Sequence, residues 1–188
     1  MTEDEWDLVV RVHLKGHFVP THWAASYWRA QSKARVPVSG RLVYTSSNSG
    51  LIGNPGQGNY SAAKAGIASF SIVCAKELDR YGVKSNCVAP SARTQMTTST
   101  EWLRDLMGAP PDDDRFDVWD PANNSPLVAY LASEECAFNG STFTSRGGTV
   151  GIMAPWKLEH QLERDSRWTA AELATELKSF APITNAGE

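Results

Sequence analysis

The sequence predicts an α/β domain with a parallel sheet, and three features of the chain support this fold class. The runs over residues 41–46 and 83–89 have the length of strands, and Gly82 and Pro90 bound the second of them. A helix-like run over residues 60–81 separates them. Because strands that alternate with helices are joined by right-handed crossovers, we expect the two strands to lie parallel in one sheet.

Composition predicts a globular protein with a single domain over residues 1–188. The chain is 41% hydrophobic and has a net charge of -3, which gives no reason to expect nucleic acid or an anionic membrane as partner. No apolar run approaches the ~20 residues of a membrane span, and the first residues are acidic where a secretory leader would be basic. The cysteines are odd in number and lack C-x-x-C spacing, which indicates reduced thiols and a cytoplasmic location.

A long helix is predicted over residues 3–31. Thr2 is suited to cap it, acidic residues occupy its first turn, and apolar residues recur at helical spacing. Pro20 is expected to kink this helix. A polar loop over residues 33–40 then leads into the first strand.

The second half of the chain contains fewer strands than such a sheet usually has. Gly82 ends the preceding helix, and the strand of residues 83–89 ends at Pro90. The loop over residues 91–117 has the length of a lid or binding segment and contains a short helical piece at 101–107. The remaining predicted elements are a helix over residues 125–133, one last strand bracketed by 140–143 and 147–152, and an amphipathic helix over 170–180. About three strands are found in all.

The stretch over residues 47–64 combines residue types that suit proton transfer. Tyr60 and Lys64 are four residues apart, so they share one face of a helix, where an ammonium favours the ionised form of a phenol. Ser47, at the end of the preceding strand, can return to the same point and donate a hydrogen bond to a substrate oxygen. The three side chains are predicted to converge on one oxygen.

A Tyr-x-x-x-Lys pair alone is more often an ordinary pair on a helix surface, but here a strand, a serine and a Gly-rich loop precede it. Ser47, Tyr60 and Lys64 stand at the spacing of the signature of the short-chain dehydrogenase/reductase (SDR) family, and G-N-P-G-Q-G-N-Y-S-A-A-K-A-G (residues 53–66) is typical of that family. The chain resembles this family. The resemblance implies a doubly wound, Rossmann-like parallel sheet in three α/β/α layers, of which this chain holds the later strands and helices.

The resemblance corresponds to the later part of the family fold. A complete member opens with a strand, a Gly-rich turn over the cofactor pyrophosphate and an Asn-Ala-Gly turn, none of which stands in the expected place here. The glycines of residues 50–58 are spaced G-x-x-G-x-x-G-x-G and do not match the dinucleotide fingerprint G-x-G-x-x-G. We therefore expect an N-terminally incomplete domain without the Gly-rich half of the nucleotide site.

The resemblance also implies catalytic roles. Tyr60 would be the acid/base, Lys64 would assist it, and Ser47 would orient the substrate oxygen. His13 occupies the place of a family asparagine that holds a water in the proton relay. The implied reaction is the interconversion of a secondary alcohol and a ketone.

The implied cofactor is NAD or NADP, and the segment that would decide between them is not in this sequence. Tyr60 and Lys64 would contact the nicotinamide ribose, and Pro90, Ser91 and Thr94 correspond to the family segment that meets the nicotinamide. Ser91 replaces the usual glycine of that segment.

Two further segments indicate a substrate class. V-H-L (residues 12–14) and D-P-A-N-N-S-P-L-V-A-Y-L-A-S (residues 120–133) are similar to the dehydrogenase part of peroxisomal multifunctional enzymes, which acts on hydroxyacyl thioesters. The alternative is a truncated, non-catalytic subunit that keeps the family's assembly surfaces. Because the helices over 3–31 and 60–81 form the usual subunit interface of the family, a homo-oligomer is expected in either case.

A metal site is not expected. His13 and His17 have the i, i+4 spacing seen in zinc sites, but no glutamate follows His13 and no third ligand is evident. One packed histidine and one surface histidine are predicted instead.

Overall fold

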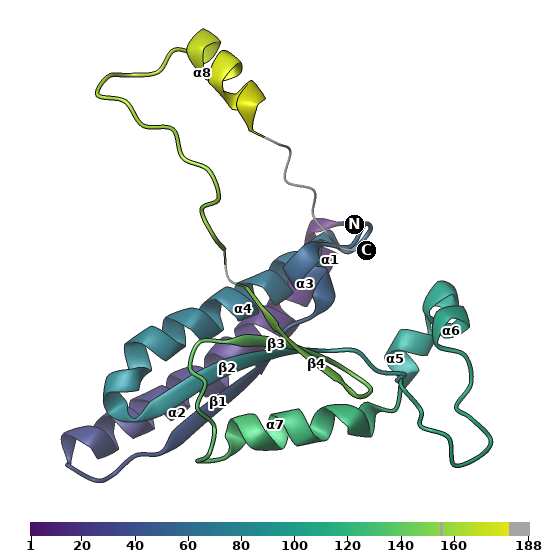
Figure 1. Ribbon diagram of the computed structural model, residues 1–188. Coiled ribbons are helices and arrows are strands. Elements are labelled where there is room, and N and C mark those ends of the chain that lie inside the picture. Colours follow the sequence, from purple (N-terminus) through teal and green to yellow (C-terminus); the bar gives the residue numbers. More distant parts are fainter. Residues whose placement is uncertain (155, 181–188) are drawn as a thin grey trace. The chain divides into compact units, whose positions relative to one another are not determined.

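The computed structural model describes residues 1–154 and 156–180 (Figure 1). Contacts divide the chain into two compact units, residues 1–153 and residues 154–188. The first unit contains a four-stranded sheet in the order β1-β2-β3-β4. Its strands are β1 (Gly40–Thr45), β2 (Val83–Pro90), β3 (Thr142–Arg146) and β4 (Thr149–Met153). The α/β fold class is confirmed, whereas the single incomplete domain stays a prediction.

The sheet is parallel except at its last strand. β1 pairs with β2 and β2 with β3 in parallel, but β3 and β4 are antiparallel. The prediction of one last strand is wrong, because Gly147 and Gly148 form a two-residue turn that pairs Arg146 with Thr149. Gly147 has a φ of +54°, which glycine adopts without strain. The count of about three strands is therefore one too low.

The first helical segment is interrupted near its middle. α1 (Glu3–Val10) is capped by Thr2 in a capping box with Glu5, as predicted for its N-terminus. A π-helical turn over Arg11–Lys15 then leads into α2 (Gly16–Lys33). The prediction of one uninterrupted helix over residues 3–31 is therefore wrong at this turn. A π turn takes backbone carbonyls out of the regular ladder, and the ring of His17 bonds to one of them, the carbonyl oxygen of His13, at 2.7 Å.

The helices cover both faces of the sheet, which makes three layers (Figure 1). Successive β1 residues alternate between the faces. Tyr44 packs in a core with Ile67 and Leu78 of α4 (Gly58–Leu78), against which α2 also packs. Val43 belongs to the other core, formed with α7 (Ser125–Ala132). The prediction for α7 is confirmed within one residue, whereas α4 begins two residues earlier and ends three residues earlier than the predicted range of 60–81.

Two segments that the sequence indicated as loops contain short helices. α3 (Asn48–Ile52) lies inside the Gly-rich stretch after β1, and α5 (Gln95–Thr98) precedes the expected α6 (Glu101–Met107). Both have side-chain caps, from Ser47 and Thr94 respectively, which satisfy backbone N–H groups that a short apolar pattern cannot reveal. Single 3₁₀ turns follow α4, at Asp79–Tyr81, and precede α7, at Pro121–Asn124.

The second unit contains α8 (Ala170–Glu176), capped by Thr169 and followed by a 3₁₀ turn at Leu177–Ser179. The helix predicted over 170–180 thus ends as an α-helix at Glu176. Among the described residues, no helix has the length and apolarity needed to cross a membrane.

The buried thiol of Cys87 and the buried phenol of Tyr44 predict a loss of stability at alkaline pH. Burial raises the pKa of Cys87 from its ordinary 9.0 to about 11, and burial also raises the pKa of Tyr44. A raised folded-state pKa stabilises the fold below the unfolded pKa, and this contribution disappears as pH rises through the folded pKa. Between about pH 8 and about pH 11, the free energy of unfolding of the parent should fall by about 2 kcal/mol more than that of Cys87→Ala.

Urea unfolding at the two pH values measures this difference, with Cys136→Ala as a control for removing a buried thiol elsewhere. Burial lowers the pKa of Lys64, so Lys64 contributes with the opposite sign in the parent and in both variants. Cys87→Ala also removes the charge that raises the pKa of Lys64, which changes the pH dependence in the same direction as the loss of the Cys87 thiol. If the free energy of unfolding had the same pH dependence in the parent and in Cys87→Ala, the raised pKa assigned to Cys87 would be wrong.

Candidate active site

The predicted catalytic residues lie at the carboxyl ends of β1 and β2, the edge where ligands bind in open α/β sheets. Ser46 holds the end of β1 in place through hydrogen bonds to both β2 and α4. Its backbone N–H donates to the oxygen of Val88 in β2 at 2.8 Å, and its buried hydroxyl donates to the backbone oxygen of Lys64 at 2.8 Å. The strand end and the start of α4 are therefore held together at the point where the signature residues stand.

Lys64 is buried, with 6% of its surface exposed. Its Nζ donates a hydrogen bond to the backbone oxygen of Thr45 at 2.9 Å and lies 5.6 Å from the ring centroid of Tyr60. Burial lowers the pKa of Lys64 from its ordinary value, and the neighbouring Cys87 opposes this shift less strongly. The predicted pairing of Tyr60 with Lys64 on one face of α4 is thus present in the structure.

His13 joins this pair from the π turn between α1 and α2. Its ring meets the ring of Tyr60 edge to face, with centroids 5.1 Å apart and an interplanar angle of 85°. Burial lowers the pKa of His13, and the charges of Lys64 and His17 lower it further. The imidazole is therefore neutral at pH 7, a state in which one ring nitrogen accepts and the other donates a hydrogen bond.

Ser47 is positioned by its own helix. Its Oγ accepts the backbone N–H of Ser49 at 3.2 Å and so caps α3. α3 packs closely on α4 at Gly50, where a Cβ atom would lie 2.6 Å from the backbone nitrogen of Ala65. Direct contacts join His13, Tyr60 and Lys64, whereas Ser47 is linked to them through α3 and through Ser46. Its convergence with Tyr60 on one oxygen stays a prediction.

The predicted nicotinamide segment follows β2 on the same edge of the sheet. Ser91 donates its backbone N–H to the oxygen of Ser145 in β3 at 2.8 Å, and its hydroxyl accepts from Asn48 Nδ2 at 3.4 Å. The backbone at Ser91 has no positive φ, so the family's glycine is not required by its conformation. The hydrogen bond from Asn48 thereby links the segment after β2 to the segment after β1 that carries Ser47.

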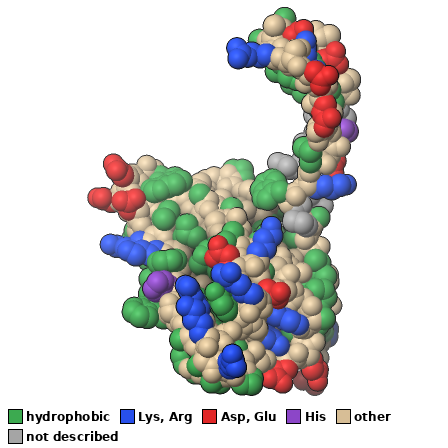
Figure 2. All heavy atoms as spheres, turned by 90° about the vertical axis from the view of Figure 1, so that its left-hand side faces the viewer, with side chains coloured by type: hydrophobic (Ala, Val, Ile, Leu, Met, Phe, Trp, Pro, Cys, Tyr) green, Lys and Arg blue, Asp and Glu red, His purple; other side chains and the backbone are tan. Residues whose placement is uncertain are grey.

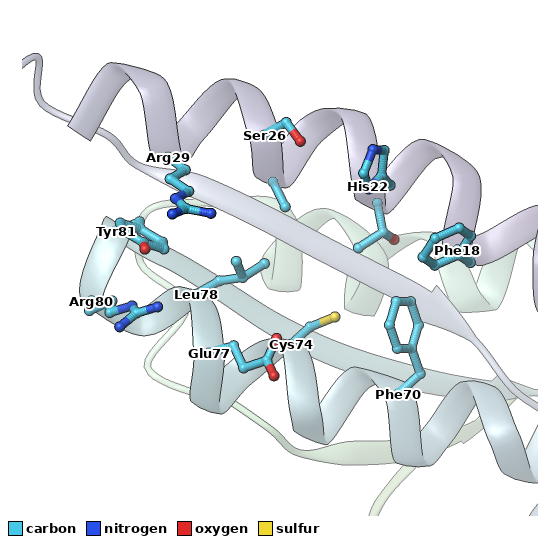
Figure 3. A pocket seen from close by; sticks show the side chains of 12 residues that line it. Phe18, His22, Ser26, Arg29, Phe70, Cys74, Glu77, Leu78, Arg80 and Tyr81 are labelled. Carbon is cyan, nitrogen blue, oxygen red and sulfur yellow. The ribbon is translucent and has the colours of Figure 1, made fainter. Parts of the chain in front are cut away.

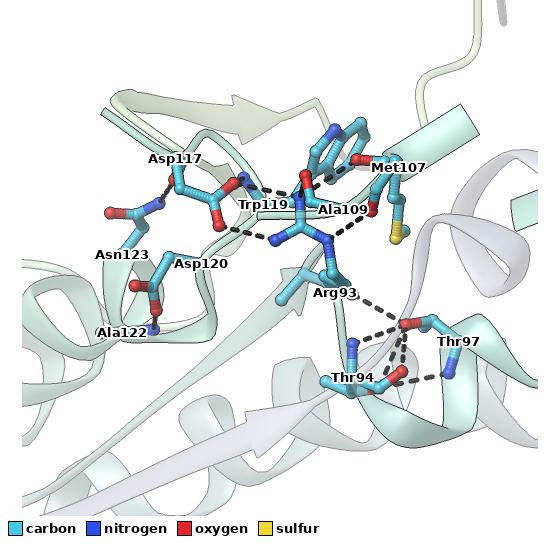
Figure 4. Close-up of polar contacts among 12 residues, drawn as sticks. Arg93, Thr94, Thr97, Met107, Ala109, Asp117, Trp119, Asp120, Ala122 and Asn123 are labelled. Carbon is cyan, nitrogen blue, oxygen red and sulfur yellow. Dashed lines mark hydrogen bonds and ion pairs between the residues drawn. The ribbon is translucent and has the colours of Figure 1, made fainter. Parts of the chain in front are cut away.

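Thr94 caps α5 through hydrogen bonds with Thr97, and the neighbouring Arg93 anchors the loop that follows (Figure 4). The Arg93 guanidinium forms a two-pronged ion pair with Asp117, the shorter contact being 2.6 Å, and donates to the backbone oxygens of Met107 and Gly108. The hydrogen bonds from Arg93 lower the pKa of Asp117. These bonds fix both ends of the long loop next to the predicted nicotinamide segment.

Three contributors to this arrangement are missed by the sequence analysis. His17, predicted as either a packed or a surface residue, is half-buried, stacks on Tyr44 at 5.9 Å and bonds to the backbone of His13. The prediction that one of the two histidines lies on the surface is wrong, because both are half-buried. Gly50 and Arg93 carry no local sequence signal, since each acts through partners distant along the chain.

No group of three His, Cys, Asp or Glu side chains in the described part of the chain could hold a metal ion. The rings of His13 and His17 instead pack against Tyr60 and Tyr44 respectively, and the ring of His17 bonds to the backbone oxygen of His13, so their i, i+4 spacing reflects packing. The absence of a metal from the working protein stays a prediction.

Known proteins similar to this chain share its fold and its sequence. The chain is 41% identical over 186 residues to the hydroxyacyl-CoA dehydrogenase ChsB1 of Mycobacterium tuberculosis, covering 96% of this chain and 57% of that protein. It is 35% identical to the human (3R)-3-hydroxyacyl-CoA dehydrogenase over 79% of this chain and 55% of the relative. A crystal structure of a short chain dehydrogenase from Mycobacterium avium matches with a TM-score of 0.81 and 44% identity, covering 95% of this chain and 57% of the other.

The chain thus spans about half the length of the curated relatives it matches. The family described as short chain dehydrogenase matches residues 1–104, which include the helices and strands that carry His13, Ser47, Tyr60, Lys64 and Ser91. This protein belongs to the short-chain dehydrogenase family.

Proposed function

We propose that this chain, in an assembly that supplies the rest of the nucleotide site, interconverts a secondary alcohol and a ketone with NAD or NADP. The observation that carries this proposal is the cluster of Tyr60, Lys64 and His13 at the carboxyl edge of the sheet. The substrate is proposed to be a 3-hydroxyacyl thioester, because relatives that match most of the chain are named hydroxyacyl-CoA dehydrogenases. The compartment is proposed to be the cytoplasm, where the buried free thiols stay reduced.

Each residue of the cluster has a defined task in alcohol oxidation. Tyr60, as a phenolate that the ammonium of Lys64 stabilises, takes the proton of the substrate hydroxyl and becomes a neutral phenol. Ser47 donates a hydrogen bond that orients the substrate oxygen. His13, neutral at pH 7 and in contact with Tyr60, passes the proton onward through water.

The residues present fit the nicotinamide end of a dinucleotide. The carboxyl edge offers the donors of Tyr60 and Lys64 on one side and the Pro90, Ser91 and Thr94 segment on the other. Beside that segment, the Oγ of Ser145 is buried and has no hydrogen-bond partner among the described residues, and Ser145 pairs with Pro90 across the sheet. The nicotinamide group, when bound, supplies the hydride acceptor.

Cofactor affinity tests the need for the rest of the fold. The charged pyrophosphate of a dinucleotide is usually held by a Gly-rich helix N-terminus, and such a turn is not found in residues 1–188. We predict that the chain alone binds NADH and NADPH more weakly than about 10 μM, roughly -7 kcal/mol. Calorimetric titration measures this.

The matched experiment adds the part of ChsB1 that this chain does not span, which we call the ChsB1 complement. Binding of one reduced cofactor should tighten at least tenfold when the complement is bound. Saturable binding tighter than about 10 μM by the chain alone would show that the ChsB1 complement is not needed for cofactor binding.

Assembly is proposed to occur through α2 and α4. The cavity between these helices has a volume of ≈ 320 Å³, and Phe18 and Phe70 face each other across it (Figure 3). Nearby on α2, Trp23 and Tyr27 are 69% and 60% exposed. On the face shown in Figure 2, hydrophobic side chains lie among basic ones. Exposed aromatic residues of this kind are typical of interfaces between subunits.

We predict a homodimer or larger assembly at micromolar concentration, measured by light scattering. Trp23→Glu should dissociate it, because a carboxylate would be buried in the interface. Trp102→Glu, which changes an exposed tryptophan on α6, should leave the assembly intact. A monomeric parent would refute the prediction. The same surface supports the second candidate function, a non-catalytic subunit that only assembles with complete family members.

A further inference from the structure

The proposed mechanism gives no task to His17, a half-buried side chain at the start of α2 that bonds to the backbone of His13. Its Nδ1 lies 2.7 Å from the backbone oxygen of His13. Because a carbonyl oxygen can only accept, Nδ1 carries the hydrogen and donates it. The other ring nitrogen, Nε2, lies 3.4 Å from the backbone nitrogen of Thr45 and accepts from it. The partners on both sides of the imidazole therefore require the Nδ1–H tautomer.

The stronger of these bonds acts where the helix departs from regular geometry. His13 lies inside the π turn Arg11–Lys15, in which backbone hydrogen bonds span one residue more than in an α-helix. If this turn relaxed to a regular α-helix, the residues before it would rotate by about 100° about the helix axis, the angle between successive α-helical residues. Such a rotation would carry the ring of His13 away from the ring of Tyr60, from which it is 5.1 Å distant.

His17 is itself held from two sides. Its ring stacks on the ring of Tyr44 in β1, with centroids 5.9 Å apart and an interplanar angle of 25°. Its backbone oxygen accepts from the hydroxyl of Thr21 at 2.7 Å, and that hydroxyl lies 2.8 Å from the hydroxyl of Tyr44. Both Thr21 and Tyr44 are buried. The sheet thus fixes His17 through its ring and through its backbone, which makes it a rigid support for the π turn.

Packing of the first helices on α4 is the competing explanation of the π turn. The side chain of Asn59 donates to the backbone oxygen of Glu5 at 3.3 Å. Leu14 lies against Gly66, where an added Cβ atom would be 3.2 Å from Leu14 Cδ1. These contacts hold the helices on α4, but neither of them engages the backbone oxygen of His13, to which His17 donates directly.

We infer that His17 is a positioning residue of the proposed site: its Nδ1–H holds the backbone of the π turn and thereby keeps the ring of His13 against Tyr60. His17 carries no proton in the reaction, because the backbone oxygen that accepts from it has no hydrogen to pass on. The inference rests on the proposed function only for the use of His13 in proton transfer. The placement of His13 is measured on the chain alone, without cofactor or substrate, so failure of the inference is distinguishable from failure of the chemistry.

The first measurement is the tautomer of His17, from the nitrogen NMR shifts of the imidazoles in the labelled chain. The sample is kept at about pH 8.5, where an imidazole of ordinary pKa is neutral. We expect His17 to have a protonated Nδ1 and an unprotonated Nε2. The exposed ring of His22, on the same helix, is the internal reference and should populate both tautomers. A protonated Nε2 with a bare Nδ1 at His17 would overturn the inference.

The second measurement is the nuclear Overhauser contact between the rings of His13 and Tyr60. His17→Asn and His17→Leu form a matched pair, because the two side chains have the same branched shape and only asparagine can donate to the oxygen of His13. The contact should remain in His17→Asn and disappear in His17→Leu. His22→Ala, which removes the exposed ring on α2, should keep the contact.

Two results of this comparison contradict the inference. A contact that persists in His17→Leu would show that packing on α4 alone fixes the π turn. A contact that disappears from both variants, while circular dichroism shows that both are folded, would show that the ring of His17 acts by filling space beside Tyr44. If His17→Leu does not fold, the tautomer of the parent and the contact in His17→Asn decide between the two explanations.

Discussion

Tyr60→Phe, assayed with the ChsB1 complement bound, is expected to lose 10²–10⁴-fold in turnover, roughly the contribution of general acid/base catalysis. The substitution removes one hydroxyl and keeps the ring that packs against His13. The fold and the binding of the complement should therefore be unchanged, which circular dichroism and the dissociation constant of the complement measure.

The matched control is Tyr27→Phe, which removes the hydroxyl of an exposed tyrosine on α2. Its turnover should equal that of the parent. If Tyr60→Phe retains turnover within about threefold of the parent, Tyr60 is not the acid/base.

Gly50→Ala is expected to lower the free energy of unfolding by about 1–3 kcal/mol. A Cβ atom at Gly50 would lie 2.6 Å from the backbone nitrogen of Ala65 and 2.6 Å from the carbonyl carbon of Lys64. Backbone atoms cannot rotate away as a side chain can, so α3 must shift away from α4. Because Ser47 caps α3, the shift should also move Ser47 relative to Lys64 and reduce turnover.

Urea unfolding of the chain measures the stability change. Gly58→Ala is the control, because its new Cβ would meet only the flexible end of Met1, at 3.5 Å. That variant should be as stable as the parent or up to about 1 kcal/mol more stable. A Gly50→Ala protein as stable as the parent would mean that α3 and α4 are not held together at this point.

Local patterns were enough to predict the core of the candidate site. The i, i+4 spacing of Tyr60 and Lys64 follows from helix geometry alone, and α4 places the two residues together as that spacing requires. The strands β1 and β2 were predicted within a residue, because turn residues bound them, Gly40 at the start of β1 and Gly82 and Pro90 at the two ends of β2. The prediction of Thr2 as the N-cap of α1 rested on equally local residues.

The features that the sequence did not predict depend either on contacts between residues far apart along the chain or on a turn that was interpreted wrongly. Arg93 and Asp117 pair across a long loop, and nothing in either segment identifies the partner. The β3–β4 hairpin did have a local signal, since Gly147 and Gly148 stand between two β-prone runs, but the glycines were interpreted as the bounds of one strand. The π turn at Arg11–Lys15 keeps the apolar spacing of an ordinary helix and so leaves no mark in the pattern.

The most direct test of the central claim is hydride transfer by the chain with the ChsB1 complement bound. The absorbance of reduced nicotinamide is followed with 3-hydroxybutanoyl-CoA and either oxidised cofactor, and butanoyl-CoA, which lacks the hydroxyl, is the control. We expect saturable reduction of one of the two cofactors with the hydroxyacyl thioester, none with butanoyl-CoA, and loss of the signal in Tyr60→Phe. No reduction of either cofactor by the bound complex, or reduction that persists in Tyr60→Phe, would contradict the assignment of Tyr60, Lys64 and His13 as the site of alcohol oxidation.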